Sequence, residues 1–193
     1  MMNDLRTDAD VLRLEIFNTS AWMTKAENLR RAASVFEGLI RNHRQLPSSD
    51  RHGDKSYLNA HFMLMGFAIE NLLKAIIVLT QLAKLQREFD QKKKLPDILQ
   101  THNLLDLFDC SGLRTDSGKI KGLLMRLSRS IIWEGRYPAP LRPEDYRRKD
   151  TFDLGAKFVT INAFADADVQ NLDALFNGLL DIVKKEKAKL SKI

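Results

Sequence analysis

Hydrophobic positions between residues 19 and 46 recur at alternating intervals of four and three residues. They are Trp22, Ala26, Leu29, Ala33, Phe36 and Ile40. This spacing places apolar side chains on one face of an α-helix. Thr19 and Ser20 are both good N-caps, and the residue before Pro47 avoids the helical conformation. We therefore predict an amphipathic helix from about residue 19 to residue 46, preceded by a loosely attached arm at 1–18.

Residues 54–85 are apolar almost all round the helix that they are expected to form. A helix of this kind lies in the middle of a bundle. Its polar exceptions are Glu70, Lys74 and Gln81, and at 100° per residue they share one narrow strip. The pattern predicts a core helix that carries a single polar line.

The remaining pattern predicts shorter elements. Residues 87–94 indicate a charged helix end or linker, and Thr101 begins a short helix that Gly112 ends. Amphipathic helices are expected from about 115 to 134 and from about 166 onwards, the latter ending in a basic tail at 186–193. Between them, 135–150 is expected to be a long loop rich in proline and arginine, and 152–164 a short helix.

Together these elements predict an all-α fold in a single domain, residues 1–193. No internal repeat and no sustained alternation of a β-strand is present. We expect an up-and-down bundle of four to five main helices, with the Pro/Arg-containing loop before the last helices. The length of 193 residues is sufficient for one core.

Charge and cysteine content limit the kinds of partner and the cellular compartment that we expect for the protein. The formal net charge of +6 permits binding to nucleic acid or another anionic partner without requiring it. Cys110 is the single cysteine, which excludes an intramolecular disulfide and fits a reducing compartment. The N-terminus lacks the pattern of a signal peptide, and the longest apolar stretch, 62–69, is too short to span a bilayer. We expect a cytoplasmic protein with no membrane segment.

The polar residues of the core helix leave two interpretations open. Glu70 and Lys74 are either an ordinary ion pair four residues apart or the wall of a polar cleft. His61 is expected to be a core histidine with one hydrogen bond, and His102 either part of a cap or a donor to the core helix. No metal-ligand spacing, phosphate-binding loop or Ser-His-Asp signature occurs, so neither a metal nor a cofactor is expected.

The segment WEGRYPAP, residues 133–140, combines aromatic and basic side chains. Guanidinium groups bind phosphates and aromatic rings stack on bases, so Trp133, Arg136 and Tyr137 are candidates for contact with single-stranded nucleic acid or a nucleotide. In the alternative interpretation, Trp133 and Tyr137 plug the end of the bundle and Arg136 caps the preceding helix. Acidic residues in the same loop reduce its positive charge.

Three motifs in this order resemble the HEPN superfamily of small all-α proteins. They are GFAIENLLKAIIV (66–78), THNLLDLF (101–108) and WEGRYPAP (133–140). The resemblance covers roughly residues 20–185 and implies a helical bundle that forms a homodimer. It also implies a candidate polar site made of Glu70, Lys74, His102 and Arg136.

Many members of that superfamily are metal-independent RNases that act in toxin–antitoxin and phage-defence systems. Their mark is an arginine followed, after four to six residues, by a histidine, and this chain lacks the pair. We therefore expect a non-catalytic HEPN-like protein that binds RNA, a nucleotide or a partner protein. Two alternatives stay open: a divergent RNase with acid–base residues such as His102, and a regulatory subunit that works through protein contacts alone.

Overall fold

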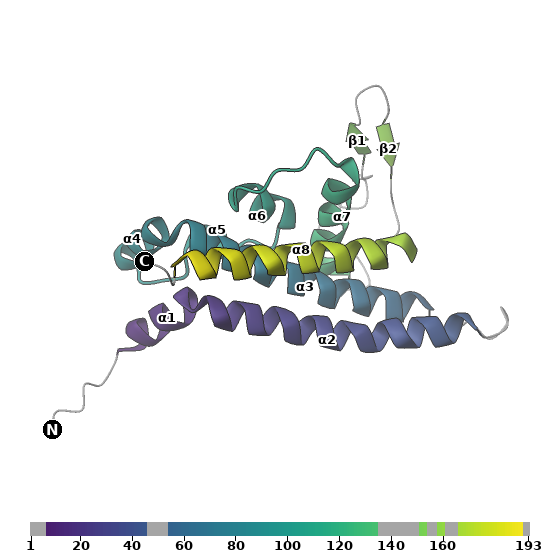
Figure 1. The fold of residues 1–193 in the computed structure, drawn as a ribbon, viewed down its shortest axis with the longest axis horizontal. Helices are drawn as coiled ribbons and strands as arrows, with labels where there is room; N and C mark the ends of the chain where they lie inside the picture. Colours follow the sequence, from purple (N-terminus) through teal and green to yellow (C-terminus); the bar gives the residue numbers. More distant parts are fainter. Residues whose placement is uncertain (1–6, 46–53, 135–150, 154–157, 161–165, 191–193) are drawn as a thin grey trace.

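The computed structural model describes residues 7–45, 54–134, 151–153, 158–160 and 166–190 (Figure 1). The described part confirms the all-α prediction, with eight α-helices in place of the four to five main helices expected. Three long helices run along the long axis: α2 (Thr19–Arg44), α3 (Asp54–Thr80) and α8 (Asp166–Leu190). In Figure 1, α2 runs opposite to α3 and α8.

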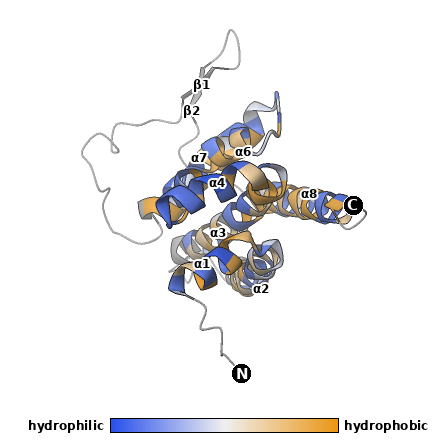
Figure 2. Ribbon diagram, turned by 90° about the vertical axis from the view of Figure 1, so that its left-hand side faces the viewer, coloured by the Kyte–Doolittle hydropathy of each residue, from blue (hydrophilic) through white to orange (hydrophobic). Residues whose placement is uncertain are grey.

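The most apolar helix, α3, lies in the middle of the others. Viewed end-on in Figure 2, it has α2 below it, α8 beside it and the short helices of residues 82–92, 104–110 and 118–129 above it. Its side chains supply most of the largest buried residues, among them Phe62, Met65, Ile69, Leu72, Leu73, Ile76 and Ile77. The central position predicted for this helix is therefore confirmed, since every residue from Leu72 to Val78 is buried.

Helix α2 presents the predicted stripe to α3. Ala26, Ala33 and Ile40 are buried, and Trp22 and Leu29 pack against the same core. The small alanines allow α2 and α3 to approach closely along their length. An ion pair between Arg30 Nη2 and Asp173 Oδ1, 2.6 Å apart, joins α2 to α8.

The predicted N-terminal arm is partly a helix. Helix α1 (Asp8–Phe17) begins with a capping box, in which Thr7 and Asp10 each bond the other's backbone. Ile16 is buried, and the indole Nε1 of Trp22 donates to the carbonyl oxygen of Ile16 at 2.8 Å. The end of this segment is thus anchored to the core, contrary to the expectation of a loose arm.

The helix predicted to extend to residue 85 ends five residues earlier. Gln81 leaves the helical conformation, with φ −123° and ψ 23°, and α4 (Leu82–Lys92) continues in a new direction. The side chain of Gln81 donates to the carbonyl oxygen of Cys110 at 2.6 Å, which fixes the bend. The change of direction allows Leu85 and Phe89 to enter the core.

Two short helices follow, α5 (Asp97–Gln100) and α6 (Leu104–Cys110). As predicted, Gly112 follows the end of α6, where its φ of 79° suits a residue without a Cβ. Helix α7 (Gly118–Arg129) then passes into a π-helical turn, η2 (Ser130–Glu134), so the predicted helix 115–134 is regular only in part.

A short hairpin stands where a short helix was expected. Strands β1 (Thr151–Asp153) and β2 (Phe158–Thr160) pair antiparallel, with Phe152 opposite Val159. With three residues in each strand, the alternation was too short to detect in the sequence. The final helix begins at Asp166 as predicted and continues through most of the expected basic tail to Leu190. The predicted loop 135–150 lies outside the described residues.

By length and composition, α3 is able to cross a membrane, which corrects the expectation drawn from residues 62–69. The span Tyr57–Thr80 contains an 18-residue window with a mean hydropathy of 1.9. However, 72% of this window is buried inside the structure, and core helices of soluble proteins pass the same test. The burial accounts for the apolar composition without a bilayer.

Candidate functional site

Glu70 and Lys74 form an ion pair inside the core, on successive turns of α3. Lys74 Nζ lies 2.6 Å from Glu70 Oε1, and each residue is only 5% exposed. The ion-pair interpretation is therefore confirmed, and the pair is enclosed, whereas the polar cleft stays a prediction. Removing two charges from water costs several kcal/mol unless further hydrogen bonds compensate.

His102 supplies the further contact that Glu70 requires. Its Nδ1 lies 3.1 Å from Glu70 Oε1 and 3.0 Å from Glu70 Oε2. The prediction that His102 contacts a polar group of the core helix is confirmed. Glu70 thus stands between one cation on its own helix and an imidazole 32 residues further along the chain.

The chain around His102 is fixed by capping contacts. The side chain of Asn103 accepts hydrogen bonds from the amides of Leu105 and Asp106 and so caps α6. The amide of Leu104 donates to Ser128 Oγ at 2.9 Å, which joins this segment to α7. His102 is therefore held against α3 from both the α6 and the α7 side.

The orientation of His102 leaves its other nitrogen available. An ionised carboxylate only accepts hydrogen bonds, so Nδ1 carries the hydrogen that faces Glu70. The side chain of His102 is 48% exposed, and Nε2 has no hydrogen-bond partner within the described ranges. The cluster therefore closes inside the core at Lys74 and opens to solvent at His102.

Trp22 contacts the buried end of this cluster. Lys74 Nζ lies 6.0 Å from the centre of the Trp22 ring, within the range of a cation–π contact. The sequence pattern places Trp22 on the hydrophobic stripe of α2 and does not link it to Lys74. The only available signal was an aromatic residue on the face turned to the core helix.

Gln81, the third member of the polar strip, does not join the site. Its side chain, just beyond the end of α3, donates a hydrogen bond to the carbonyl oxygen of Cys110 on α6. His61 also takes no part, since its Nδ1 lies 3.1 Å from the carbonyl oxygen of Ala33 on α2. The expectation of a core histidine with one hydrogen bond is confirmed.

The other candidates from the WEGRYPAP segment are outside what the structure describes. Arg136 and Tyr137 lie in the undescribed range 135–150. The backbone of Trp133 belongs to η2, but its side chain is likewise not described. The π-helical turn itself packs on α3. Gly66, one turn before Glu70, allows this approach, because a Cβ there would stand 2.5 Å from Ile131 Cγ2.

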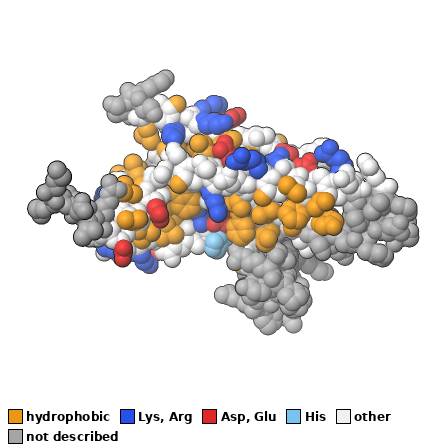
Figure 3. All heavy atoms as spheres, turned by 90° about the horizontal axis from the view of Figure 1, so that it is seen from below, with side chains coloured by type: hydrophobic (Ala, Val, Ile, Leu, Met, Phe, Trp, Pro, Cys, Tyr) orange, Lys and Arg blue, Asp and Glu red, His pale blue; other side chains and the backbone are white. Residues whose placement is uncertain are grey.

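Figure 3 shows histidine, acidic and basic atoms together within a mainly hydrophobic face of the molecule. Within the described ranges, no group of three or more His, Cys, Asp and Glu side chains is placed to hold a metal ion. The cluster can instead offer a hydrogen-bond acceptor at His102 Nε2, or a positive charge when the imidazole is protonated. These are functions of ligand binding and proton transfer.

Comparison with known proteins gives no further assignment. A scan against family models, a search of curated proteins and a search of solved structures each found no match. The geometry of the Glu70–Lys74–His102 cluster is therefore the basis for any functional argument.

Proposed function

We propose that this chain is a non-catalytic HEPN-like protein, an up-and-down helical bundle that binds single-stranded RNA or a nucleotide. The observation that carries the proposal is the cluster of Glu70, Lys74 and His102. Ionised groups on the most apolar helix are costly to bury, and groups retained at such a cost are concentrated at functional sites. The same three residues belong to the motifs that resemble the superfamily.

The charges of the cluster favour an anionic ligand. With His102 protonated, two cations surround one carboxylate, and an anion that approaches the exposed imidazole ring encounters a net positive charge. A phosphate would accept a hydrogen bond from His102 Nε2. Arg136 is proposed to bind a second phosphate, and Trp133 or Tyr137 to stack on a base.

The proposal excludes the RNase chemistry of the superfamily because the arginine–histidine motif is missing. No histidine follows His102 in the chain, so none can stand four to six residues after Arg129 or Arg136. Binding can persist without cleavage, since phosphate contacts need only positive charge and donors.

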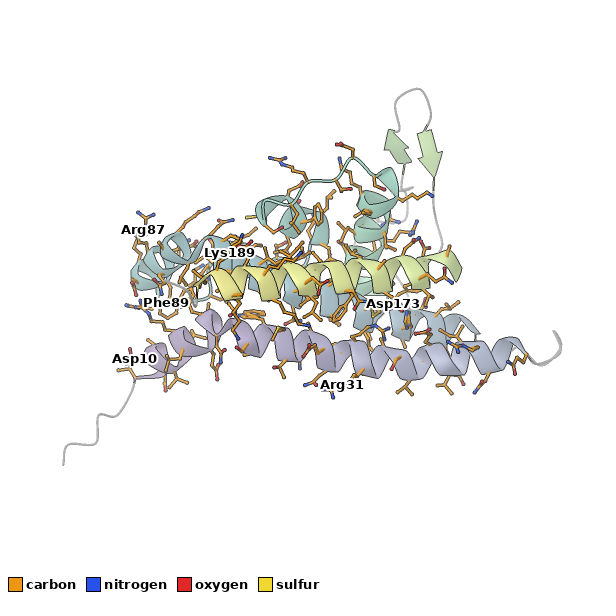
Figure 4. The ribbon with its side chains drawn as sticks, viewed as in Figure 1. Asp10, Arg31, Arg87, Phe89, Asp173 and Lys189 are labelled. Atoms are coloured by element: carbon orange, nitrogen blue, oxygen red, sulfur yellow. The ribbon has the colours of Figure 1, made fainter. Side chains whose placement is uncertain are left out.

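The test is the binding of labelled single-stranded RNA over a series of salt concentrations. His102→Ala should weaken binding about tenfold or more, the usual effect of removing a hydrogen bond to a charged group. The matched control is Arg31→Ala, which removes a cation from the outer face of α2, where Figure 4 shows Arg31 pointing away from the bundle. The control should bind within about twofold of the wild type. Equal affinity of the His102→Ala variant and the wild type would refute the proposed site.

Arg136→Ala tests the proposed second phosphate contact. This change should weaken RNA binding and leave the melting temperature unaltered. A lower melting temperature with full binding would instead assign Arg136 to the end of the bundle, in agreement with the alternative interpretation of WEGRYPAP.

One observation favours a second candidate, a divergent RNase. A buried carboxylate that fixes the Nδ1 hydrogen of a half-exposed histidine is the arrangement that prepares Nε2 to act as a general base. The same RNA samples, run on a denaturing gel, distinguish the two candidates. Cleavage by the wild type that is lost in His102→Ala would replace the binding proposal by the enzymatic one.

We also propose that the protein is a cytoplasmic homodimer. Its proposed partner is RNA, a nucleotide or another protein of a toxin–antitoxin or defence system. The exposed side chains Val35 and Leu39, four residues apart on α2, support a contact face on that helix. They are 62% and 40% exposed, so both are available for contact with another chain.

A further inference from the structure

A groove lies between α8 and the chain that runs from the end of α6 into α7, and we name it the α7–α8 groove. Its volume is about 500 Å³. Most of its lining is aliphatic, contributed by Leu113, Ile120 and Leu123 on one side and by Leu175, Leu179 and Ile182 on the other. The groove is separate from the Glu70–Lys74–His102 cluster, none of whose members lines it.

The groove exists because α8 uses only part of its surface to pack on α3. Leu172, Phe176 and Val183 are buried in the core, whereas the neighbouring face carries the small residues Ala174 and Gly178. A Cβ added at Gly178 would meet no atom within 4 Å. Small side chains therefore leave an open apolar channel along the helix.

The charged residues that line the groove are positive, and Ser117 and Asn171 are its neutral polar residues. Arg114 and Lys119 are exposed and lie on the α7 side, and among the described residues no Asp or Glu lines the groove. Neither cation is ion-paired within the part of the chain that the structure describes. Ser117 lies between them in sequence and makes no capping hydrogen bond with its side chain, so its hydroxyl can donate to a ligand.

We propose that the α7–α8 groove binds an alkyl carboxylate, with the hydrocarbon chain along the aliphatic lining and the carboxylate at Arg114 and Lys119. The volume is in the usual range of small-molecule sites, and an apolar wall with few polar groups is their usual composition. Two exposed cations at the edge of an apolar channel match a ligand with one anionic end. A second copy of the chain is a poorer match, because its net charge of +6 opposes approach to this basic edge.

The first experiment is a calorimetric titration with octanoate, decanoate and dodecanoate, each below its micelle concentration. Burial of each added methylene should increase affinity about two- to fourfold until the channel is full. The dodecyltrimethylammonium cation has the same chain and the opposite charge, and it should bind at least about tenfold more weakly. No binding of dodecanoate, or equal binding of the cation, would overturn the proposal.

Two variants test the placement of the ligand. Gly178→Leu fills the channel and should abolish dodecanoate binding, while its melting temperature should be maintained or raised because leucine favours a helix over glycine. Arg114→Ala combined with Lys119→Ala should weaken binding about tenfold, and Arg31→Ala serves as the control for lost charge. If Gly178→Leu does not fold, Ala174→Leu replaces it at the same face.

Unchanged binding in the folded channel-filling variant would place the ligand elsewhere and contradict the assignment. Sedimentation velocity of the wild type and of Gly178→Leu measures whether the groove mediates self-association. Self-association of the wild type that Gly178→Leu abolishes, with no binding of dodecanoate, would assign the groove to a second copy of the chain and overturn the proposal. These outcomes are independent of RNA binding, since none of the variants alters Glu70, Lys74 or His102.

Discussion

Gly66 shows how one missing side chain allows two elements to approach. Its position on α3 faces η2, and a Cβ there would stand 2.5 Å from Ile131 Cγ2 and 3.5 Å from the carbonyl oxygen of Leu127. We predict that Gly66→Ala lowers the free energy of unfolding by about 1–3 kcal/mol, the usual cost of overpacking a core. Urea denaturation measures the change.

The matched control for this variant is Gly38→Ala on α2, where an added Cβ meets no atom within 4 Å. Alanine favours a helix over glycine, so this change should raise the free energy of unfolding by about 0.5–1 kcal/mol. Stabilisation by both substitutions would contradict the close contact between α3 and η2.

Glu70 and Lys74 should depend on one another for stability. Lys74→Met or Glu70→Met alone leaves a buried charge without its main partner, and each should cost about 3 kcal/mol. The double variant removes both charges and replaces them with side chains that suit the core. Its cost should be at least about 2 kcal/mol smaller than the sum of the single costs.

A double-mutant cycle in urea provides this coupling energy. Additive costs would mean that the two side chains are solvated separately, which would contradict the 2.6 Å contact between them.

Some contacts between residues could be predicted from the sequence and others could not. The spacing of Glu70 and Lys74 was sufficient to predict their pairing, whereas the contact of Lys74 with Trp22 joins residues 52 positions apart and depends on how α2 and α3 pack.

At the scale of elements, Glu88 fastens the corner between α4 and α5. Its Oε1 accepts a hydrogen bond from the backbone amide of Asp97 at 2.9 Å and another from Lys92 Nζ at 3.0 Å. The hydrogen bond from Asp97, followed by that from Lys92, holds the pKa of Glu88 below its ordinary value of 4.5. The carboxylate is thus favoured in the folded state.

This lowered pKa predicts a pH-dependent contribution to stability. Because the folded pKa lies below the unfolded one, the contribution is complete above pH 4.5 and is lost as the pH falls through the folded pKa. Glu88→Ala should therefore cost about 1 kcal/mol at neutral pH, as for the loss of a helix cap, and progressively less in acid. A cost that does not change between neutral pH and acid would contradict this account.

The elements also show where sequence patterns are sufficient. Periodicity located α2, α3 and α8 because each buries a long face, and hydrophobic spacing records that burial directly. The end of α3 could not be predicted, since residues 82–85 continue the helical pattern without interruption. The bend depends on the bond from Gln81 to a carbonyl 29 residues away and on the core positions that Leu85 and Phe89 occupy.

At the scale of the whole molecule, α3 determines the architecture. Every residue of α3 from Leu72 to Val78 is buried, with α2, α8 and shorter helices around the helix (Figure 2). The charged cluster is the exception on this apolar helix. Glu70, Lys74 and His102 could be named as candidate site residues because they lie in the two motifs GFAIENLLKAIIV and THNLLDLF. That the Glu70–Lys74 pair is enclosed and not exposed on the surface could be seen only in the packed structure.

The proposed homodimer gives a prediction at this scale. Light scattering should report about twice the chain mass of 22.1 kDa. Val35→Lys combined with Leu39→Lys should shift the protein to the monomer without unfolding it, because both side chains are exposed in the single chain. A dimer that persists in this variant would exclude this part of α2 as the contact, and a monomeric wild type would refute the dimer itself.

The measurement that tests the central claim most directly is the NMR signal of the His102 ring as a short single-stranded RNA is added. His61 provides an internal control, since it is fully buried and bonded to the carbonyl oxygen of Ala33. We predict that the His102 ring signal shifts in proportion to bound RNA while that of His61 stays constant. Binding of the RNA without a change at His102, or no binding at low salt, would contradict the assignment of the Glu70–Lys74–His102 cluster as the ligand site.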